Sequence, residues 1–310
     1  MVIRVAAAKG VLAVQLCLAL AVAGAGAAVA EPDEVAGCGR WSATTVASGY
    51  SMLENLAFDG RGGMLLSELA LSSSGGAVHV LRADGTRAVV ASVNHPGGLV
   101  VSGGTAYVAA GGDFTLGGPG KSDGAIEAID LDSGAVSTVA SGLTAPNGLA
   151  RLPDGGFVVS RDIGSPTTLT RVARDGSGAH TLAPGLTSTN GLAYDPVRRK
   201  LFVSTTFESV TTLAAIDIDH PDTPPARSTV PGFGLLNAAD DLTVGSDGNV
   251  YLALNVAGRI VRVDPDTGST CTIADGLPFA TSARFGSGPG WDPGSLYVTS
   301  FLGTVTRLTP

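Results

Sequence analysis

The sequence has 310 residues, with 19 basic and 27 acidic side chains and a formal net charge of -8. This acidic balance argues against nucleic acid as a partner, because a phosphate-binding surface needs clustered Lys and Arg. An anionic surface instead suits cations or neutral substrates.

The first 30 residues are expected to form a secretory signal peptide. Arg4 and Lys9 give a positive start, residues 11–30 are apolar and rich in Ala, and Ala28-Val-Ala ends the run as a small-residue cleavage site. A single membrane helix is the alternative, because the run is nearly long enough to span a bilayer. The small residues at its end favour the signal, so we expect a secreted or extracytoplasmic protein with a mature net charge of about -10.

The mature chain keeps two cysteines, Cys38 and Cys271. In an oxidising compartment a lone pair of this kind is a disulfide candidate. Residues 31–40 form a short N-terminal segment, and residues 41–310 are long enough to bury a sizeable core as one all-β domain.

Six copies of one pattern follow along the chain. Each has a start residue, a short apolar strand, a turn and a second strand that usually ends in Ser or Ala. The starts are separated by 43, 50, 43, 50 and 41 residues, which is the length of a four-stranded propeller blade. The start residues are Glu54, Gly97, Asn147, Asn190, Asp240 and Thr281.

The sixth copy lacks a fourth strand, because the sequence stops at Pro310. The segment from Trp41 to Gly49 resembles the fourth strand that begins at Ala135, so an N-terminal strand is expected to complete the last blade. The predicted fold is an all-β, six-bladed β-propeller closed by that strand. This closure would bring Cys38 close to Cys271.

The start residues are expected to converge, because the first strand of each propeller blade lines the central channel. Glu54, Asn147, Asn190 and Asp240 then offer two carboxylates and two amide oxygens. Such an oxygen-only set suits Ca²⁺ better than Zn²⁺, with Mg²⁺ or Mn²⁺ as alternatives.

Each of these residues also has an ordinary explanation. Asn147-Gly and Asn190-Gly are common turn sequences, Glu54 alone could be a solvated charge at the rim, and Asp240-Asp could cap a turn. Their shared register in four of six repeats favours one divalent-cation site at the channel mouth.

The sequence resembles the calcium-dependent six-bladed propeller superfamily of gluconolactonase, senescence marker protein and luciferin-regenerating enzyme. The resemblance rests on the spacing of the repeats, on this series of four start residues and on short motifs such as Pro146-Asn-Gly-Leu-Ala. Diisopropyl fluorophosphatase, paraoxonase and strictosidine synthase are more distant relatives. The resemblance covers residues 41–310. It implies that Glu54, Asn147, Asn190 and Asp240 bind the catalytic metal, and that Asp241 is a fifth candidate ligand.

The same resemblance implies hydrolysis of lactones or esters. The metal would polarise the carbonyl oxygen, and Asp240 would be the catalytic carboxylate, as nucleophile or general base. The Arg-x-Asn-Asp pattern of sugar-lactone binding is absent, because Ala145-Pro precedes Asn147 and Gly148 follows it. His95 is either a turn residue or a displaced base, and blade six has no Glu for a condensing activity like that of strictosidine synthase.

Loops between the second and third strands should open at the same mouth and line a substrate pocket. The longest, Gly111 to Gly124, suits a mobile lid. The candidate pocket residues are Glu68, Asp113, Phe114, Arg161, Asp162, Phe207, Glu208, Asn255 and Phe301.

The expected partner is a small-molecule lactone or ester, with no nucleic acid, no membrane after signal removal and a monomeric state. The competing class is a non-catalytic, calcium-stabilised propeller that binds a protein, glycan or small molecule.

Overall fold

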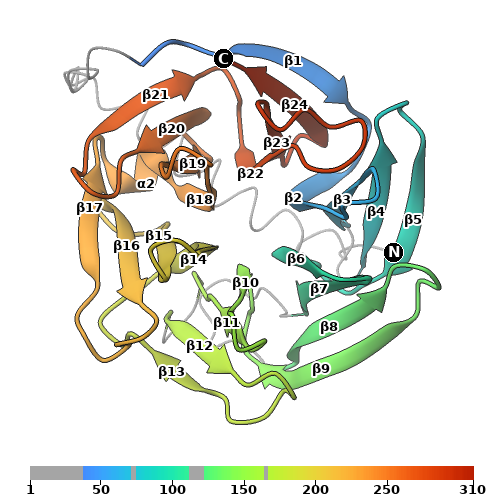
Figure 1. Cartoon of the computed structure of the whole chain (residues 1–310), viewed down its shortest axis with the longest axis horizontal. Coiled ribbons are helices and arrows are strands. Elements are labelled where there is room, and N and C mark those ends of the chain that lie inside the picture. Colours follow the sequence, from blue (N-terminus) through green and yellow to red (C-terminus); the bar gives the residue numbers. More distant parts are fainter. Residues whose placement is uncertain (1–37, 71–74, 112–121, 164–166) are drawn as a thin grey trace, which may run out of the picture.

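A computed structural model describes residues 38–70, 75–111, 122–163 and 167–310. Six four-stranded antiparallel sheets stand around a central axis as blades, which confirms the predicted six-bladed β-propeller (Figure 1). The signal peptide predicted over residues 1–30, and most of the segment 31–40, lie outside the described residues. So do Asp113, Phe114 and most of the predicted lid.

In the first five blades the strands follow one another from the inner strand to the outer one. The first two blades consist of β2 (Met52–Phe58), β3 (Gly63–Leu69), β4 (Gly76–Arg82) and β5 (Arg87–Ser92), then β6 (Leu99–Ser102), β7 (Thr105–Ala110), β8 (Gly124–Asp130) and β9 (Val136–Leu143). The third consists of β10 (Leu149–Arg151), β11 (Phe157–Val159), β12 (Leu169–Val172) and β13 (His180–Leu182).

The fourth blade contains β14 (Thr189–Asp195), β15 (Lys200–Thr205), β16 (Thr211–Asp217) and β17 (Ala226–Val230). One helical turn, α2 (Gly234–Asn237), leads to the fifth blade, which contains β18 (Ala239–Val244), β19 (Val250–Leu254), β20 (Arg259–Val263) and β21 (Thr270–Ala274). In the described part of the chain, no helix has the length and apolar character needed to cross a membrane.

The sixth blade joins the two ends of the chain. Its strands β22 (Ala280–Phe285), β23 (Leu296–Ser300) and β24 (Thr304–Thr309) come last in the sequence, and β1 (Ser42–Ala47) pairs antiparallel with β24 as the outer strand. Just before β1, Cys38 is disulfide-bonded to Cys271 of β21, with 6.0 Å between the two Cα atoms. The bond therefore links the closing strand to the outer strand of the neighbouring blade.

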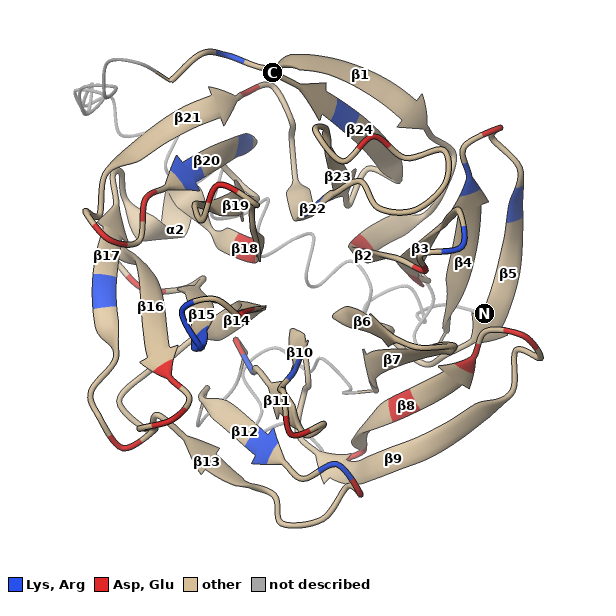
Figure 2. Cartoon of the chain, in the orientation of Figure 1, with Lys and Arg blue, Asp and Glu red and all other residues tan. Residues whose placement is uncertain are grey.

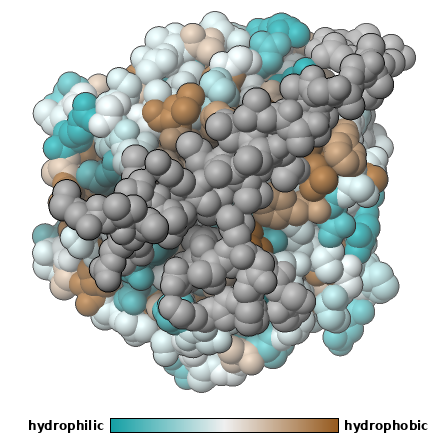
Figure 3. Space-filling model, turned by 180° about the vertical axis from the view of Figure 1, so that it is seen from behind, coloured by the Kyte–Doolittle hydropathy of each residue, from teal (hydrophilic) through white to brown (hydrophobic). Residues whose placement is uncertain are grey.

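The core lies between neighbouring blades rather than at the centre of the ring. Six clusters of buried apolar side chains each fill the space between facing sheets. The side chains of a strand alternate between its two faces, so the inner strands β2, β6, β10 and β14 each contribute to the clusters on both sides. Seen from behind, the described surface shows small apolar patches between polar ones (Figure 3).

Candidate metal centre

Three of the four predicted metal ligands lie at irregularities of the inner strands. The pairing register of the first strand with the second shifts between Leu53 and Asn55, between Thr189 and Leu192, and between Ala239 and Leu242. A β-bulge inserts an extra residue and redirects its side chain. Glu54, Asn190 and Asp240 occupy these insertions, which explains how they leave the regular alternation of the sheet.

A serine at the end of the second strand holds the inner strand in three blades. The Oγ atoms of Ser67, Ser160 and Ser204 accept hydrogen bonds from the backbone N–H groups of Asn55, Gly148 and Gly191, at 2.9, 2.7 and 2.8 Å. All three serines are buried. The repeated serine thus fixes the backbone just after the start residue.

Gly148 and Gly191 have a different role from the turn predicted as the alternative for Asn-Gly. Neither has a positive φ angle. A Cβ atom on Gly148 would lie 2.3 Å from the carbonyl oxygen of Asn190, and one on Gly191 would lie 2.5 Å from the Cα of Asp241. The turn interpretation is therefore wrong: these glycines permit the close approach of neighbouring inner strands at the channel.

Glu54 and Asp240 are buried together at the mouth, with 8% and 5% of their surface exposed. Burial, followed by repulsion from Asp162 and Asp241, raises the pKa of Glu54 to about 8. Burial, and then repulsion from Glu54, Asp241 and Asp162, raises the pKa of Asp240 well above its usual range. These carboxylates therefore repel one another in a poorly solvated space.

Asp162 is a further acid of this group. It is 7% exposed, and burial raises its pKa to about 6 against weaker lowering effects that include a hydrogen bond from the Asn147 side chain. Its Oδ1 atom is buried and has no hydrogen-bond partner among the described residues. The Asn147 contact places this start residue beside the acidic group.

Two buried amides also present unused oxygens. The Nδ2 of Asn190 donates to Thr206 Oγ1 at 2.9 Å, and the Nδ2 of Asn255 donates to Asp240 Oδ2 at 3.1 Å. In both cases the Oδ1 atom is buried without a hydrogen-bond partner within the described ranges. A buried acceptor with no donor is costly, so these two oxygens are suited to contact an electropositive ligand.

Asp241 is engaged differently. Its Oδ2 atom lies 2.7 Å from Asn55 Nδ2, 2.7 Å from Ser282 Oγ and 2.6 Å from the Arg284 guanidinium. Arg284 also donates to the carbonyl oxygen of Leu242 at 2.7 Å. In this ion pair Asp241 is buried and Arg284 is half-buried, and the pair places one positive charge below the acidic group.

The donor set fits a hard divalent cation. Carboxylate oxygens of Glu54, Asp162 and Asp240 and the orphaned amide oxygens of Asn190 and Asn255 are the ligand types that Ca²⁺ prefers. Across the described residues, no three His, Cys, Asp or Glu side chains form a metal-binding group by themselves. Amide oxygens would therefore have to supply a large part of the coordination of any cation bound here.

The predicted wall residues separate into two groups. Asn255, and Asp162 beside Arg161, belong to the centre. Glu68 contacts His79 Nε2 at 2.5 Å and the backbone N–H of Ser51. The remaining three described wall residues are held by their own blades. The Phe207 N–H donates to Ser188 Oγ at 2.8 Å, Glu208 accepts from Thr187 Oγ1, and Phe301 is buried with its N–H bonded to the carbonyl of Phe279.

Sequence reasoning missed Asn55, Thr206, Ser282 and Arg284, and it gave Asp162 no more weight than its neighbours. Asn55 and Ser282 directly follow start residues, so the register could have indicated them. Arg284 belongs to no motif and follows Thr281 along β22, and only its contact with Asp241 shows its role.

Comparisons with known proteins agree with this fold. Residues 73–301 match the family model described as the SMP-30/Gluconolactonase/LRE-like region. No curated protein matches the sequence.

Among solved structures, a gluconolactonase from Xanthomonas campestris is 19% identical with a TM-score of 0.67, over 90% of this chain and 93% of that one. The calcium-binding protein regucalcin from Agrobacterium tumefaciens is 16% identical with a TM-score of 0.66, over 88% and 95%. A PQQ-bound aldose sugar dehydrogenase from Streptomyces coelicolor is 18% identical with a TM-score of 0.63, over 90% and 99%. At these identities the likeness shows a shared fold, and the three proteins differ in chemistry.

Proposed function

The chain belongs to the SMP-30/gluconolactonase/LRE-like family, and we propose that it hydrolyses lactone or ester bonds with one divalent cation, Ca²⁺ in the first instance, at the channel mouth. The observation that carries this proposal is the group of buried acids and orphaned amide oxygens. Glu54 and Asp240 have raised pKa values, and the Oδ1 atoms of Asn190 and Asn255 have no donor among the described residues.

Glu54, Asn147, Asn190 and Asp240 would hold the cation, with Asp162 and Asn255 as further oxygen donors. When bound, the cation would polarise the carbonyl oxygen of the substrate and stabilise the negative charge that develops there. Asp241 is already bonded to Arg284, Asn55 and Ser282 through Oδ2, so we assign it to the support of the site.

Asp240 is the proposed catalytic carboxylate, as nucleophile or general base. Asn255 Nδ2 fixes one of its oxygens at 3.1 Å, which orients the carboxylate. In the absence of a cation, burial and neighbouring acids raise its pKa, and a bound cation would favour the ionised form that a nucleophile or general base requires. The surrounding buried side chains limit the access of bulk water to this group.

The test is turnover of a panel of lactones and aryl esters by the purified protein, with Ca²⁺ and after chelation. We expect chelator-sensitive hydrolysis, and a decrease in kcat/KM of about 10²–10⁴-fold for Asp240→Asn. Asp264→Asn is the matched control, because it makes the same change in a surface turn of the same blade. Cation binding without turnover of any substrate would instead favour the non-catalytic propeller.

We also propose that the protein is exported. The predicted signal peptide supports this, and so does the Cys38–Cys271 disulfide, since such bonds persist in oxidising compartments. Fractionation of cells that express the full chain tests it, with a cytoplasmic, uncleaved product as the contrary result.

A further inference from the structure

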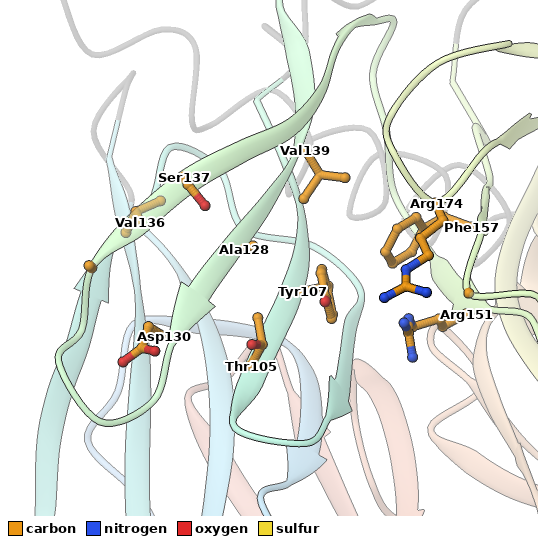
Figure 4. A pocket seen from close by; sticks show the side chains of 12 residues that line it. Thr105, Tyr107, Ala128, Asp130, Val136, Ser137, Val139, Arg151, Phe157 and Arg174 are labelled. Carbon is orange, nitrogen blue, oxygen red and sulfur yellow. The ribbon is translucent and has the colours of Figure 1, made fainter.

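A cavity of about 390 Å³ lies between the second and third blades (Figure 4). Its walls come from the ends of strands and from the turns after β8 and β10, on the face opposite the start residues. Tyr107 and Val139 lie on the blade-two side, and Arg151, Phe157 and Arg174 lie on the blade-three side. The cavity is therefore separate from the acidic mouth.

Arg151 is held in place by aromatic rings and one hydrogen bond. Its guanidinium carbon lies 5.5 Å from the centre of the Tyr107 ring and 5.9 Å from that of Phe157. One terminal nitrogen donates to Ser102 Oγ at 2.6 Å. Its Nε atom is buried and has no hydrogen-bond partner in the described part of the chain. This leaves one fixed donor unused.

Arg174 approaches Arg151 across Gly155, which has a φ angle of +86°. A Cβ atom on Gly155 would lie 2.9 Å from Arg174 Cδ and 3.4 Å from a terminal nitrogen of Arg151. The glycine thus leaves room for two guanidinium groups on one cavity. No carboxylate among the described residues forms an ion pair with either of them.

Other arginines on this face are neutralised by turn aspartates. The pairs are Arg61 with Asp132, Arg171 with Asp154, and Arg198 with Asp195 and Asp266. Figure 2 shows these acidic and basic turns around the ring. Asp130 also lines the cavity, but its Oδ1 accepts from the backbone and hydroxyl of Ser133 in its own turn. Arg151 and Arg174 therefore differ from these three arginines, because neither has a carboxylate partner among the described residues.

We propose that this cavity binds the oxyanion group of a small organic molecule, a carboxylate or a phosphate, on Arg151 and Arg174. A guanidinium presents a planar set of donors that matches such oxygens, and charge-assisted hydrogen bonds of this kind are strong. The apolar part of the ligand would lie against Tyr107, Val136 and Val139. This site is independent of the proposed hydrolysis.

The test is calorimetric titration of the purified protein with benzoate and, separately, inorganic phosphate, at an ionic strength held constant with chloride. We expect saturable binding of at least one probe. Arg174→Gln should weaken it about tenfold or more, the loss of one charge-assisted contact. Arg151→Lys keeps the charge but removes the planar guanidinium with its Nε donor, and it should also weaken binding.

Arg227→Gln is the matched control. It removes the same charge from an exposed arginine whose guanidinium donates to the carbonyl oxygen of Gly185, away from the cavity. Binding of either probe that depends on Arg174 and not on Arg227 supports the site and identifies its ligand class. Equal affinity in both variants, or no binding of either probe to the wild type, would overturn the proposal.

Discussion

At the mouth of the propeller Asp162 and Asp240 are buried and their pKa values are raised, whereas Asp217 and Asp264 lie in surface turns on the opposite face and their pKa values are lowered. Burial is the main cause at the mouth. In the turns the main cause is a hydrogen bond from a backbone N–H two residues later, from Asp219 to Asp217 and from Asp266 to Asp264.

The difference shows what each acid contributes to the fold. A turn aspartate satisfies backbone donors and stabilises the native state in its charged form. A mouth aspartate is charged only at a cost, because its neighbours are other acids and its solvation is poor. A bound cation would relieve this repulsion at the mouth, as proposed above, whereas the turn aspartates of the opposite face are already satisfied by backbone donors of their own turns.

The first test removes the internal positive charge below the mouth. Arg284→Met should lower the free energy of unfolding by about 3–5 kcal/mol, because it leaves Asp241 buried without its ion-pair partner. Urea unfolding measures this. Arg199→Met is the control on the opposite face, where the pair with Asp219 is exposed, and it should change little. Equal losses in the free energy of unfolding for the two substitutions would contradict the difference drawn between the mouth and the opposite face.

The second test is the pH dependence of stability in chelator. Glu54 and Asp162 bind protons more tightly in the folded state, with pKa values of about 8 and about 6 against ordinary values of 4.5 and 3.8. Their contribution is fully present below the ordinary values and is lost as pH rises through the folded values. We expect the cation-free protein to lose about 2–5 kcal/mol between about pH 5 and pH 8.

The turn aspartates do not obscure this result, because their lowered pKa values place their losses at more acidic pH. Thermal unfolding at each pH measures the change, and Glu54→Gln should flatten the profile. Ca²⁺ should restore stability at the alkaline end. If the cation-free protein instead became more stable as the pH rises over this range, the raised pKa values of Glu54 and Asp162 would be refuted.

The third test replaces one aspartate at the mouth and one on the opposite face by asparagine. Asp240→Asn should raise the stability of the cation-free protein near the alkaline limit by about 1–2 kcal/mol, because it removes a repelled, buried charge. Asp264→Asn should lower stability, because the amide is a weaker acceptor for the turn N–H groups. Melting temperatures in chelator give both signs, and a loss of stability in both variants would remove the distinction.

The sequence was sufficient to predict the six blades and to place Glu54, Asn190 and Asp240 at the openings of inner strands, because repeat spacing determines which residue stands there. It could not predict that the Asp162 side chain lies among the acids of the mouth, because Asp162 follows a second strand in a loop with no fixed register. The function of Gly148 was also hidden, because it depends on the backbone of Asn190 in the neighbouring blade.

The disulfide gives the ring an unequal resistance to proteolysis. A single cut at any position between Cys38 and Cys271 leaves two fragments that are still covalently joined. A cut between Cys271 and β22 instead separates β22, β23 and β24 from the covalent circle, and only their packing and the pairing of β24 with β1 would retain them. These three strands are thus the part of the propeller that a single nick can release, while β1 stays within the segment closed by the disulfide.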